Sequence, residues 1–142
     1  MSKSDLFENA LIDLIFNATP IANLADDAAA SPLTNLYVSL HTGDPGEGGN
    51  QAANECAYTG YARVAVARNG TGWTVSGNSV SPAANIDFPE ASAGSETATH
   101  FAVGTDPSGA GRVLYFGTIS PTIAISAGVT PRLGTGTAIT ED

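Results

Sequence analysis

The sequence predicts a mainly β fold, an antiparallel β-sandwich or jelly roll, with one α-helix at its N-terminus. Short segments that alternate apolar and polar residues recur roughly every ten residues, as about seven short strands would. Glycine and proline separate them: the 142 residues include 16 glycines and 8 prolines, and only 13% are charged. We expect a β-sandwich domain over residues 33–142, preceded by a helix and linker over residues 1–32 that could serve as a contact arm.

Residues 5–18 are expected to form the helix, because apolar side chains recur there at three- and four-residue steps. Asp5 could cap it with Glu8 three residues later, and Pro20 follows its end. The apolar surface is wider than one contact face needs. We favour packing on the protein's own sheet, and docking on a partner is the alternative. The helix residues that we assign to contact with a partner are Leu6, Phe7, Leu11, Ile12 and Phe16.

A strand is expected over residues 36–41, where apolar residues alternate with Tyr37, Ser39 and His41. Two hairpins follow, one joining 61–68 to 73–75 and one joining 99–104 to 112–118. Residues 89–97 are expected to form a loop. Further short strands are expected at 85–88, 122–126 and 129–133.

A long surface loop is expected from residue 43 to residue 60. Its first half contains Asp-Pro and four glycines, which favour turns and cost entropy to order. We therefore expect the loop to become ordered only against a partner. The loop residues assigned to that contact are Asp44, Pro45, Glu47 and Asn50.

The net charge of the chain indicates which classes of partner it can bind. Fourteen acidic residues against five basic ones give a net charge of −9, without any Lys/Arg cluster, so nucleic acid is not expected to bind. No apolar run of the length that spans a bilayer is present, so neither export nor membrane insertion is expected. Cys56 is the single cysteine and cannot form an intrachain disulfide, which fits folding in a reducing cytoplasm.

No catalytic residue, cofactor or metal site is expected, and we do not expect an enzyme. His41 and His100 lie in predicted strands without a Gly-x-Ser-x-Gly motif, and Cys56 has no basic neighbour in sequence to activate it. The histidines and carboxylates lack the spacing of zinc or calcium sites. Trp73 and the tyrosines are interpreted as core residues. A glycan-binding module or glycan-active enzyme that uses them is the alternative from another class.

Two adjoining motifs carry a resemblance. Residues 36–51, LYVSLHTGDPGEGGNQ, followed by residues 54–66, NECAYTGYARVAV, resemble a family of small proteins encoded among the virion genes of tailed phages and often labelled tail fibre proteins. The likeness continues through GW at 72–73, IDFP at 86–89, THF at 99–101 and GRVLY at 111–115. It covers roughly residues 33–133 and leaves the N-terminal helix outside.

The resemblance implies a structural protein of the virion, made in the host cytoplasm. The compact β-rich build is also similar to capsid cement or decoration proteins, and a fibre shaft would need repeats that this chain lacks. We therefore expect a decoration protein on the capsid surface that binds the major capsid protein and other copies of itself, as a dimer or trimer. A tail-associated protein, at the tail tip or as a minor component, is the alternative.

Overall fold

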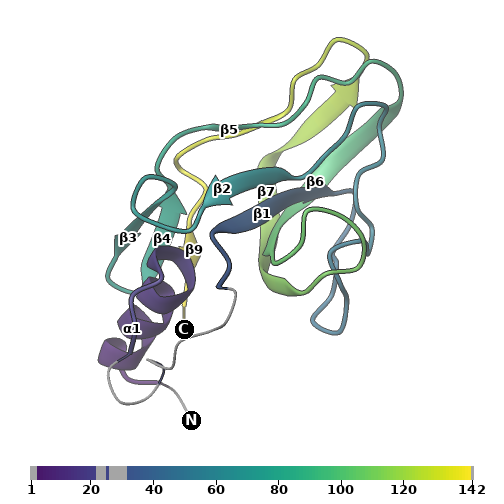
Figure 1. The fold of residues 1–142 in the computed structure, drawn as a ribbon. Coiled ribbons are helices and arrows are strands. Elements are labelled where there is room, and N and C mark those ends of the chain that lie inside the picture. The colour runs from purple at the N-terminus through teal and green to yellow at the C-terminus, as the bar shows by residue number, and fades with distance from the viewer. Residues whose placement is uncertain (1–2, 22–24, 26–31, 142) are drawn as a thin grey trace. The chain divides into compact units, whose positions relative to one another are not determined.

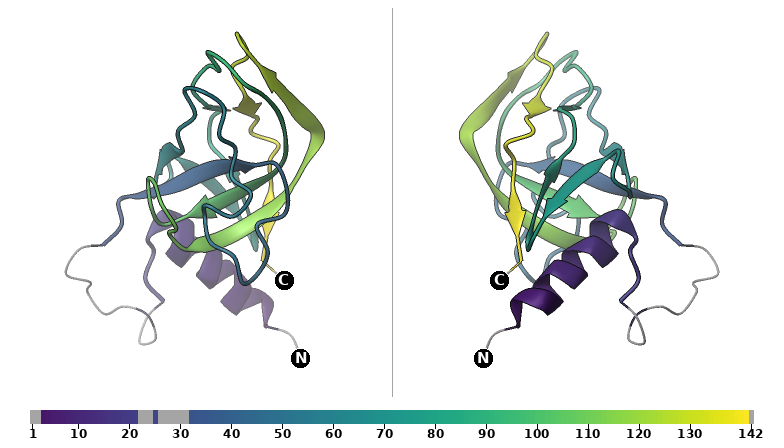
Figure 2. Two further views of the ribbon diagram at one scale, coloured as in Figure 1. Left: turned by 90° about the vertical axis from the view of Figure 1, so that its right-hand side faces the viewer. Right: turned by 90° about the vertical axis from the view of Figure 1, so that its left-hand side faces the viewer.

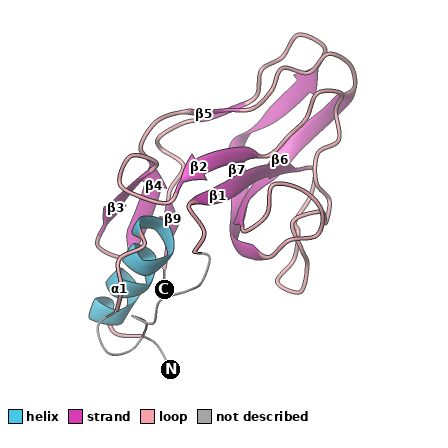
Figure 3. Ribbon diagram, in the orientation of Figure 1, coloured by secondary structure: helices cyan, strands magenta, loops and turns pink. Residues whose placement is uncertain are grey.

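The structure, a computed structural model, describes residues 3–21, 25 and 32–141. Over these residues the protein is mainly β with one helix, and the strand pairs whose register is known are antiparallel (Figures 1 and 3), which confirms the expected class. The elements are α1 (Asp5–Asn17), β1 (Asn35–His41), β2 (Val64–Ala67), β3 (Trp73–Ser76), β4 (Ser79–Pro82), β5 (Ile86–Asp87), β6 (Ser95–Gly104), β7 (Val113–Ser126), β8 (Arg132–Leu133) and β9 (Ile139–Thr140). Among the described residues, no helix has the length and apolar character needed to cross a membrane.

The chain divides into two compact units, and neither is continuous in sequence. The first unit comprises Met1–Asn35, Val66–Asn85 and Gly134–Asp142, and the second comprises Leu36–Ala65 and Ile86–Leu133. This division differs from the expected one at residue 32. The reason is that α1 packs on β3 and β4, as part of the first unit, and does not stand apart as an arm.

In the first unit, α1 covers a three-stranded sheet of order β3-β4-β9. Ile12 and Phe16 are completely buried, and the ring of Phe16 meets that of Trp73 edge-on at 4.8 Å between centroids. Together with Glu8, they define a buried stripe at four-residue steps. The helix therefore packs on its own sheet through Ile12 and Phe16, as we favoured, while Leu6 remains 81% exposed.

The helix begins differently from the prediction. Ser4 occupies the N-cap position, where its carbonyl accepts hydrogen bonds from the N–H groups of Phe7 and Glu8, so the cap expected at Asp5 is wrong. The carboxylate of Glu8 is turned to the sheet, where it accepts a hydrogen bond of 3.4 Å from the Asn78 amide. Because the Glu8 side chain points to the sheet, it does not form the predicted capping box with Asp5.

The side chain of Arg68 binds the C-terminal end of α1. The Arg68 guanidinium donates hydrogen bonds to the carbonyls of Leu14 and Ile15, at 2.5 and 2.6 Å. Positive charge is stabilising at a helix C-terminus, where carbonyl groups lack intrahelical partners. Arg68 thereby fixes the turn after β2 to the end of α1.

The second unit is built on the sheet of order β2-β1-β6-β7, with only the first half of β2 belonging to it. Leu40 of β1 pairs with Phe101 of β6, and Val103 of β6 pairs with Tyr115 of β7, so the hairpin predicted for this region is confirmed. β1 and β6 are the inner strands, and most of their side chains on both faces are buried. A separate short pair, β5 and β8, lies in the same unit.

β7 is a bent strand, as Figure 2 shows in yellow-green. Ala98 of β6 pairs with Ile123, but His100 pairs with Thr118, so the residues from 119 to 122 lie outside the regular register. The bend unites in one strand two segments that the sequence predicts separately, 112–118 and 122–126. β6 likewise begins at Ser95, inside the expected loop.

The hairpin predicted between 61–68 and 73–75 is wrong. The turn forms, since the N–H of Gly72 donates to the carbonyl of Asn69 at 3.0 Å. The strands on either side then part, because β2 joins the sheet of β1 while β3 pairs with β4 through a turn at residues 77–78. β4 and β9 were not predicted.

Candidate interaction site

The predicted contact loop, between β1 and β2, has an exposed tip at residues 44–50. Asp44, Glu47 and Asn50 are exposed, whereas Pro45 is buried and is not available to a partner. The side chain of Asp44 accepts a hydrogen bond from the N–H of Gly46 at 2.7 Å. Asn50 does the same for the N–H of Ala52 at 2.9 Å. The loop tip is thus shaped by its own polar side chains.

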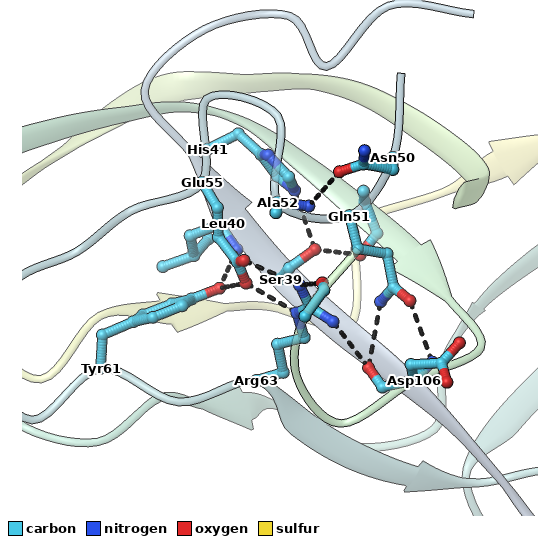
Figure 4. Close-up of polar contacts among 12 residues, drawn as sticks. Ser39, Leu40, His41, Asn50, Gln51, Ala52, Glu55, Tyr61, Arg63 and Asp106 are labelled. Carbon is cyan, nitrogen blue, oxygen red and sulfur yellow. Dashed lines mark hydrogen bonds and ion pairs between the residues drawn. The ribbon is translucent and has the colours of Figure 1, made fainter. Parts of the chain in front are cut away.

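Gln51 anchors the end of the loop tip. It is completely buried, and its backbone N–H donates to the carbonyl of Ala110 at 2.6 Å. Its side-chain amide bonds the backbone of Asp106 twice, accepting from the N–H at 2.9 Å and donating to the carbonyl at 3.3 Å (Figure 4). Gly104 and Gly111 leave room for this amide, because a Cβ at either would lie within 2.2 Å of Gln51 atoms.

A buried ion pair holds the next part of the loop. The Arg63 guanidinium bonds both carboxylate oxygens of Glu55, at 2.7 and 2.8 Å, and its side chain is only 2% exposed. It also donates to the carbonyls of Asp106 and Gly109, at 2.9 and 2.6 Å. The hydrogen bond with Glu55 raises the pKa of Arg63, so the guanidinium stays charged. One side chain therefore ties the loop to the β6–β7 connection.

Tyr61 completes this group. Its hydroxyl donates to Glu55 at 2.8 Å and accepts the N–H of Leu40 in β1 at 3.1 Å (Figure 4). Burial, and next the charge of Glu55, raise the pKa of Tyr61 above its usual range, so the phenol remains protonated and able to donate. Its ring also stacks on that of Phe88, at 6.4 Å between centroids.

His41 and Ser39 form a completely buried pair beneath the loop. Nδ1 of His41 lies 2.8 Å from the carbonyl of Ala53 and must donate to it, since a carbonyl oxygen only accepts. In the neutral ring, Nε2 then accepts from the Ser39 hydroxyl at 2.8 Å. Burial lowers the pKa of His41 below its ordinary 6.5, although the Ala53 hydrogen bond and Glu55 act in the opposite direction.

The remaining stretch of the loop is fastened by Glu96 of β6. Its carboxylate accepts hydrogen bonds from the N–H groups of Ala57 and Tyr58, at 2.9 and 2.8 Å. Cys56 beside them is 3% exposed, and burial, with the negative charge of Glu96, raises its pKa to about 12. Cys56 is therefore a protonated and unreactive thiol at neutral pH.

These contacts correct one expectation. Residues 51–60 do not need a partner to become ordered, because Gln51, Glu55 and Glu96 fix them to the sheet and to the β6–β7 connection. We name the group of Gln51, Glu55, Tyr61, Arg63 and Asp106 the loop clamp. It holds the loop tip on a rigid base, so a partner would meet a preformed surface.

Fewer of the predicted helix residues are available to a partner than we expected. Ile12 and Phe16 are fully buried and cannot contact a partner, while Phe7 and Leu11 are half-buried. Leu6 is the one residue among the predicted helix contacts that is largely exposed. The surfaces left for contact are thus Leu6 in the first unit and the loop tip in the second.

Burial limits what Ser39, His41 and Trp73 can contact. No cluster of three or more potential metal ligands occurs among the described residues. Ser39 and His41 are sealed from solvent, and Trp73 is 2% exposed, so Trp73 cannot form the surface on which a sugar would stack.

Sequence reasoning missed the loop clamp. Glu55, Tyr61 and Arg63 all stand in the second motif that carried the phage resemblance, so the signal was present in NECAYTGYARVAV. The motif alone does not indicate that these residues converge on Gln51 and Asp106, which lie elsewhere in the sequence.

A family model described as Podophage GP4 fiber I protein gp80 matches residues 2–140. The match extends over nearly the whole chain and includes the helix that the quoted motifs left out. It confirms the resemblance to small virion proteins of tailed phages. No curated protein matches the chain.

Proposed function

Because this chain belongs to the family described as Podophage GP4 fiber I protein gp80, and is thus a structural protein of the phage virion, we propose that it is a tail-fibre-associated subunit. It would act without catalysis, by binding other virion proteins. The family match is the observation that carries this proposal. Its description names a fibre, which favours the tail-associated alternative over the capsid decoration that we expected first.

The fold supports a role at a joint or tip and not along a shaft. A shaft gains length from many repeats, and the described chain instead forms two compact units from short strands. Even its longest strand, β7 with 14 residues, would extend only about 45 Å if fully straight.

The loop tip is the contact surface that we assign to this role. It carries the exposed carboxylates of Asp44 and Glu47, and the loop clamp holds it in shape. A preformed acidic loop suits a partner with a basic patch, since little ordering entropy opposes binding and opposite charges steer the encounter.

The location is tested by immunogold labelling of intact particles and of separated heads and tails. Label on the tail fibres or at their attachment point would support the proposal. Label on the heads, with binding of the purified protein to the major capsid protein, would overturn it in favour of capsid decoration.

The loop tip is tested by complementing a phage that lacks the gene. Glu47→Lys should lower incorporation into particles, because it reverses an exposed charge that no described hydrogen bond uses. Glu90→Lys makes the same reversal at an exposed position of the same unit and should be incorporated normally. Equal incorporation of the two variants would contradict the assignment of the loop tip.

A further inference from the structure

The turn between β2 and β3 contains the one Asn-Gly pair of the chain, Asn69-Gly70. An asparagine in this position can lose its side-chain amide without an enzyme, because the backbone nitrogen of the next residue can attack the side-chain carbonyl carbon. A bulky next residue hinders the approach, and glycine has no side chain. Asn69 and Gly70 are both exposed, so water has access to the turn.

The Asn69 side chain is folded back over its own turn. Its Oδ1 accepts hydrogen bonds from the Thr71 N–H at 2.9 Å and from the Thr71 hydroxyl at 2.6 Å. The bond from the N–H makes an Asx-turn, a ring of atoms that includes the Gly70 nitrogen and keeps the side-chain carbonyl near it. Both donors also point at the oxygen on which negative charge develops when the carbonyl carbon is attacked, and such donors stabilise a transition state.

The attacking nitrogen is available. Within the described part of the chain, no group accepts a hydrogen bond from the Gly70 N–H. The backbone carbonyl of Asn69, by contrast, accepts from the N–H groups of Gly72 and Trp73, at 3.0 and 3.1 Å. The turn is therefore fixed around a backbone amide that is itself unbonded.

Asn50 provides an internal comparison. Its Oδ1 accepts the N–H of Ala52 at 2.9 Å, so it forms the same kind of turn. The next residue, however, is the fully buried Gln51, whose N–H donates to the carbonyl of Ala110 at 2.6 Å. This nitrogen cannot approach the Asn50 side chain unless that bond breaks, so Asn50 should stay intact where Asn69 reacts.

We infer that Asn69 is a self-modifying site, at which the folded chain deamidates without an enzyme. The Gly70 nitrogen forms a bond to Cγ of Asn69, and the amide C–N bond breaks. The proton that the nitrogen loses ends on the leaving group, which departs as ammonia. Water then opens the resulting cyclic imide at either carbonyl and leaves aspartate or isoaspartate. Overall, one water is consumed and one ammonia is released.

The products alter the turn. Either one adds a negative charge to the net −9 of the chain. Isoaspartate also routes the main chain through the former side chain, so the hydrogen bonds from Gly72 and Trp73 lose their acceptor geometry. Arg68, the preceding residue, binds the end of α1. The modification should therefore loosen the first unit, to which all these residues belong.

Peptide mass spectrometry after incubation of the folded protein at mildly alkaline pH tests the inference. The peptide with Asn69 should gain the mass difference between an NH2 and an OH group, while peptides with Asn50 and Asn78 should not. Isoaspartate is the diagnostic product, because direct hydrolysis of the amide gives aspartate alone. The rate should rise with pH, since the nitrogen must lose a proton. Purified protein suffices, so the outcome is independent of the proposed function.

Variants separate the nitrogen from the donors. Gly70→Ala should slow the reaction severalfold by hindering the nitrogen, and the fold should tolerate it because its Cβ has nothing within 4 Å. Thr71→Val removes the hydroxyl donor, keeps the N–H donor and should also slow the reaction. Gly48→Ala adds a methyl group in similarly open space and should leave the rate unchanged.

A synthetic peptide of residues 66–74 gives the rate without the fold, and it should react no faster than the folded chain. A much faster peptide would show that the turn protects Asn69, and would overturn the inference. An unmodified Asn69, aspartate without isoaspartate, or equal rates in the wild type and Gly70→Ala would each overturn it as well.

Discussion

At the scale of single residues, His41 shows how burial turns a titratable group into a structural one. Its two ring nitrogens are used inside the second unit, one by the Ala53 carbonyl and one by the Ser39 hydroxyl. A protonated ring would carry a hydrogen on both nitrogens and could no longer accept from Ser39. A protonated ring could donate to the Ser39 hydroxyl, which would then donate to the Ala102 carbonyl at 3.5 Å, so the main reason why the folded state favours the neutral ring is burial, which lowers the pKa of His41.

This pKa predicts a loss of stability in mild acid. The unfolded chain takes up a proton on His41 near pH 6.5, while the folded chain does so only at lower pH. Between these values the unfolded state binds more protons, so the free energy of unfolding should fall as the pH drops below about 6.5. Urea unfolding at pH 7.5 and 5.5 measures it.

His41→Gln should weaken this acid sensitivity, and His100→Gln, which changes a half-exposed ring, should retain it. An equal pH dependence in the wild type and in His41→Gln would refute the role of His41.

Gly104 predicts a steric effect in the loop clamp. A Cβ there would lie 2.2 Å from the side-chain carbon of Gln51, which is fully buried and hydrogen-bonded. Gly104→Ala should therefore lower the free energy of unfolding by about 1–3 kcal/mol, as overpacking does in other interiors. Gly48→Ala has open space around its new methyl group and is the matched control. Combining Gly104→Ala with Gln51→Ala should cost less than the sum of the two single changes.

At the scale of elements, the ion pair of Glu55 and Arg63 predicts coupled behaviour of two loops. Glu55→Gln leaves the buried guanidinium without its counter-charge and should cost about 3–5 kcal/mol. Amide hydrogen exchange should then quicken in residues 51–60 and in the β6–β7 connection together, because Arg63 holds both. Asp87→Asn breaks an exposed ion pair and should leave both loops unchanged. Faster exchange in one loop only would contradict the coupling.

The sequence predicted those elements whose pattern is local. The alternation at 36–41 predicted β1, and the apolar steps at 5–18 predicted α1 to within one residue. The hairpin at 61–75 failed because a turn does not determine which strands pair. Val64 and Trp73 flank the same turn, but β2 pairs with β1, which lies well before it in the chain, and β3 pairs with β4, which follows it directly.

The loop clamp lay beyond prediction for a related reason. Gln51 and Arg63 bond to Asp106, which is 55 and 43 residues away. Polar side chains in loops have no periodicity from which such partners could be predicted. The exposed loop residues of the predicted contact set, Asp44, Glu47 and Asn50, by contrast, followed from the turn-forming composition of residues 43–50.

At the scale of the whole molecule, the helix belongs to a packed unit, and this changes what its removal should do. Deleting residues 1–20 takes away Ile12 and Phe16 and uncovers the buried Trp73. Burial of each large apolar side chain is worth roughly 1.5–3 kcal/mol, so the first unit should lose its stable fold. Amide exchange should become fast in β3, β4 and β9, and Trp73 fluorescence should shift to the red.

Leu6→Ser is the control for this deletion, because Leu6 is exposed and the change should leave both readouts unaltered. Slow exchange in β3 and β4 of the deleted chain would show that the helix is dispensable to the first unit.

Each unit is built from separate stretches of the sequence, so segments that pack together in the folded protein are synthesised at different times. Phe16 leaves the ribosome before the Trp73 on which it packs, and the roughly 57 intervening residues take about 3–11 s to synthesise. During that interval the second unit has begun but lacks β6 and β7, and the buried face of α1 has no sheet to cover. Nascent chains of this protein should therefore depend on host chaperones for several seconds, and phage yield should drop in hosts in which those chaperones are depleted.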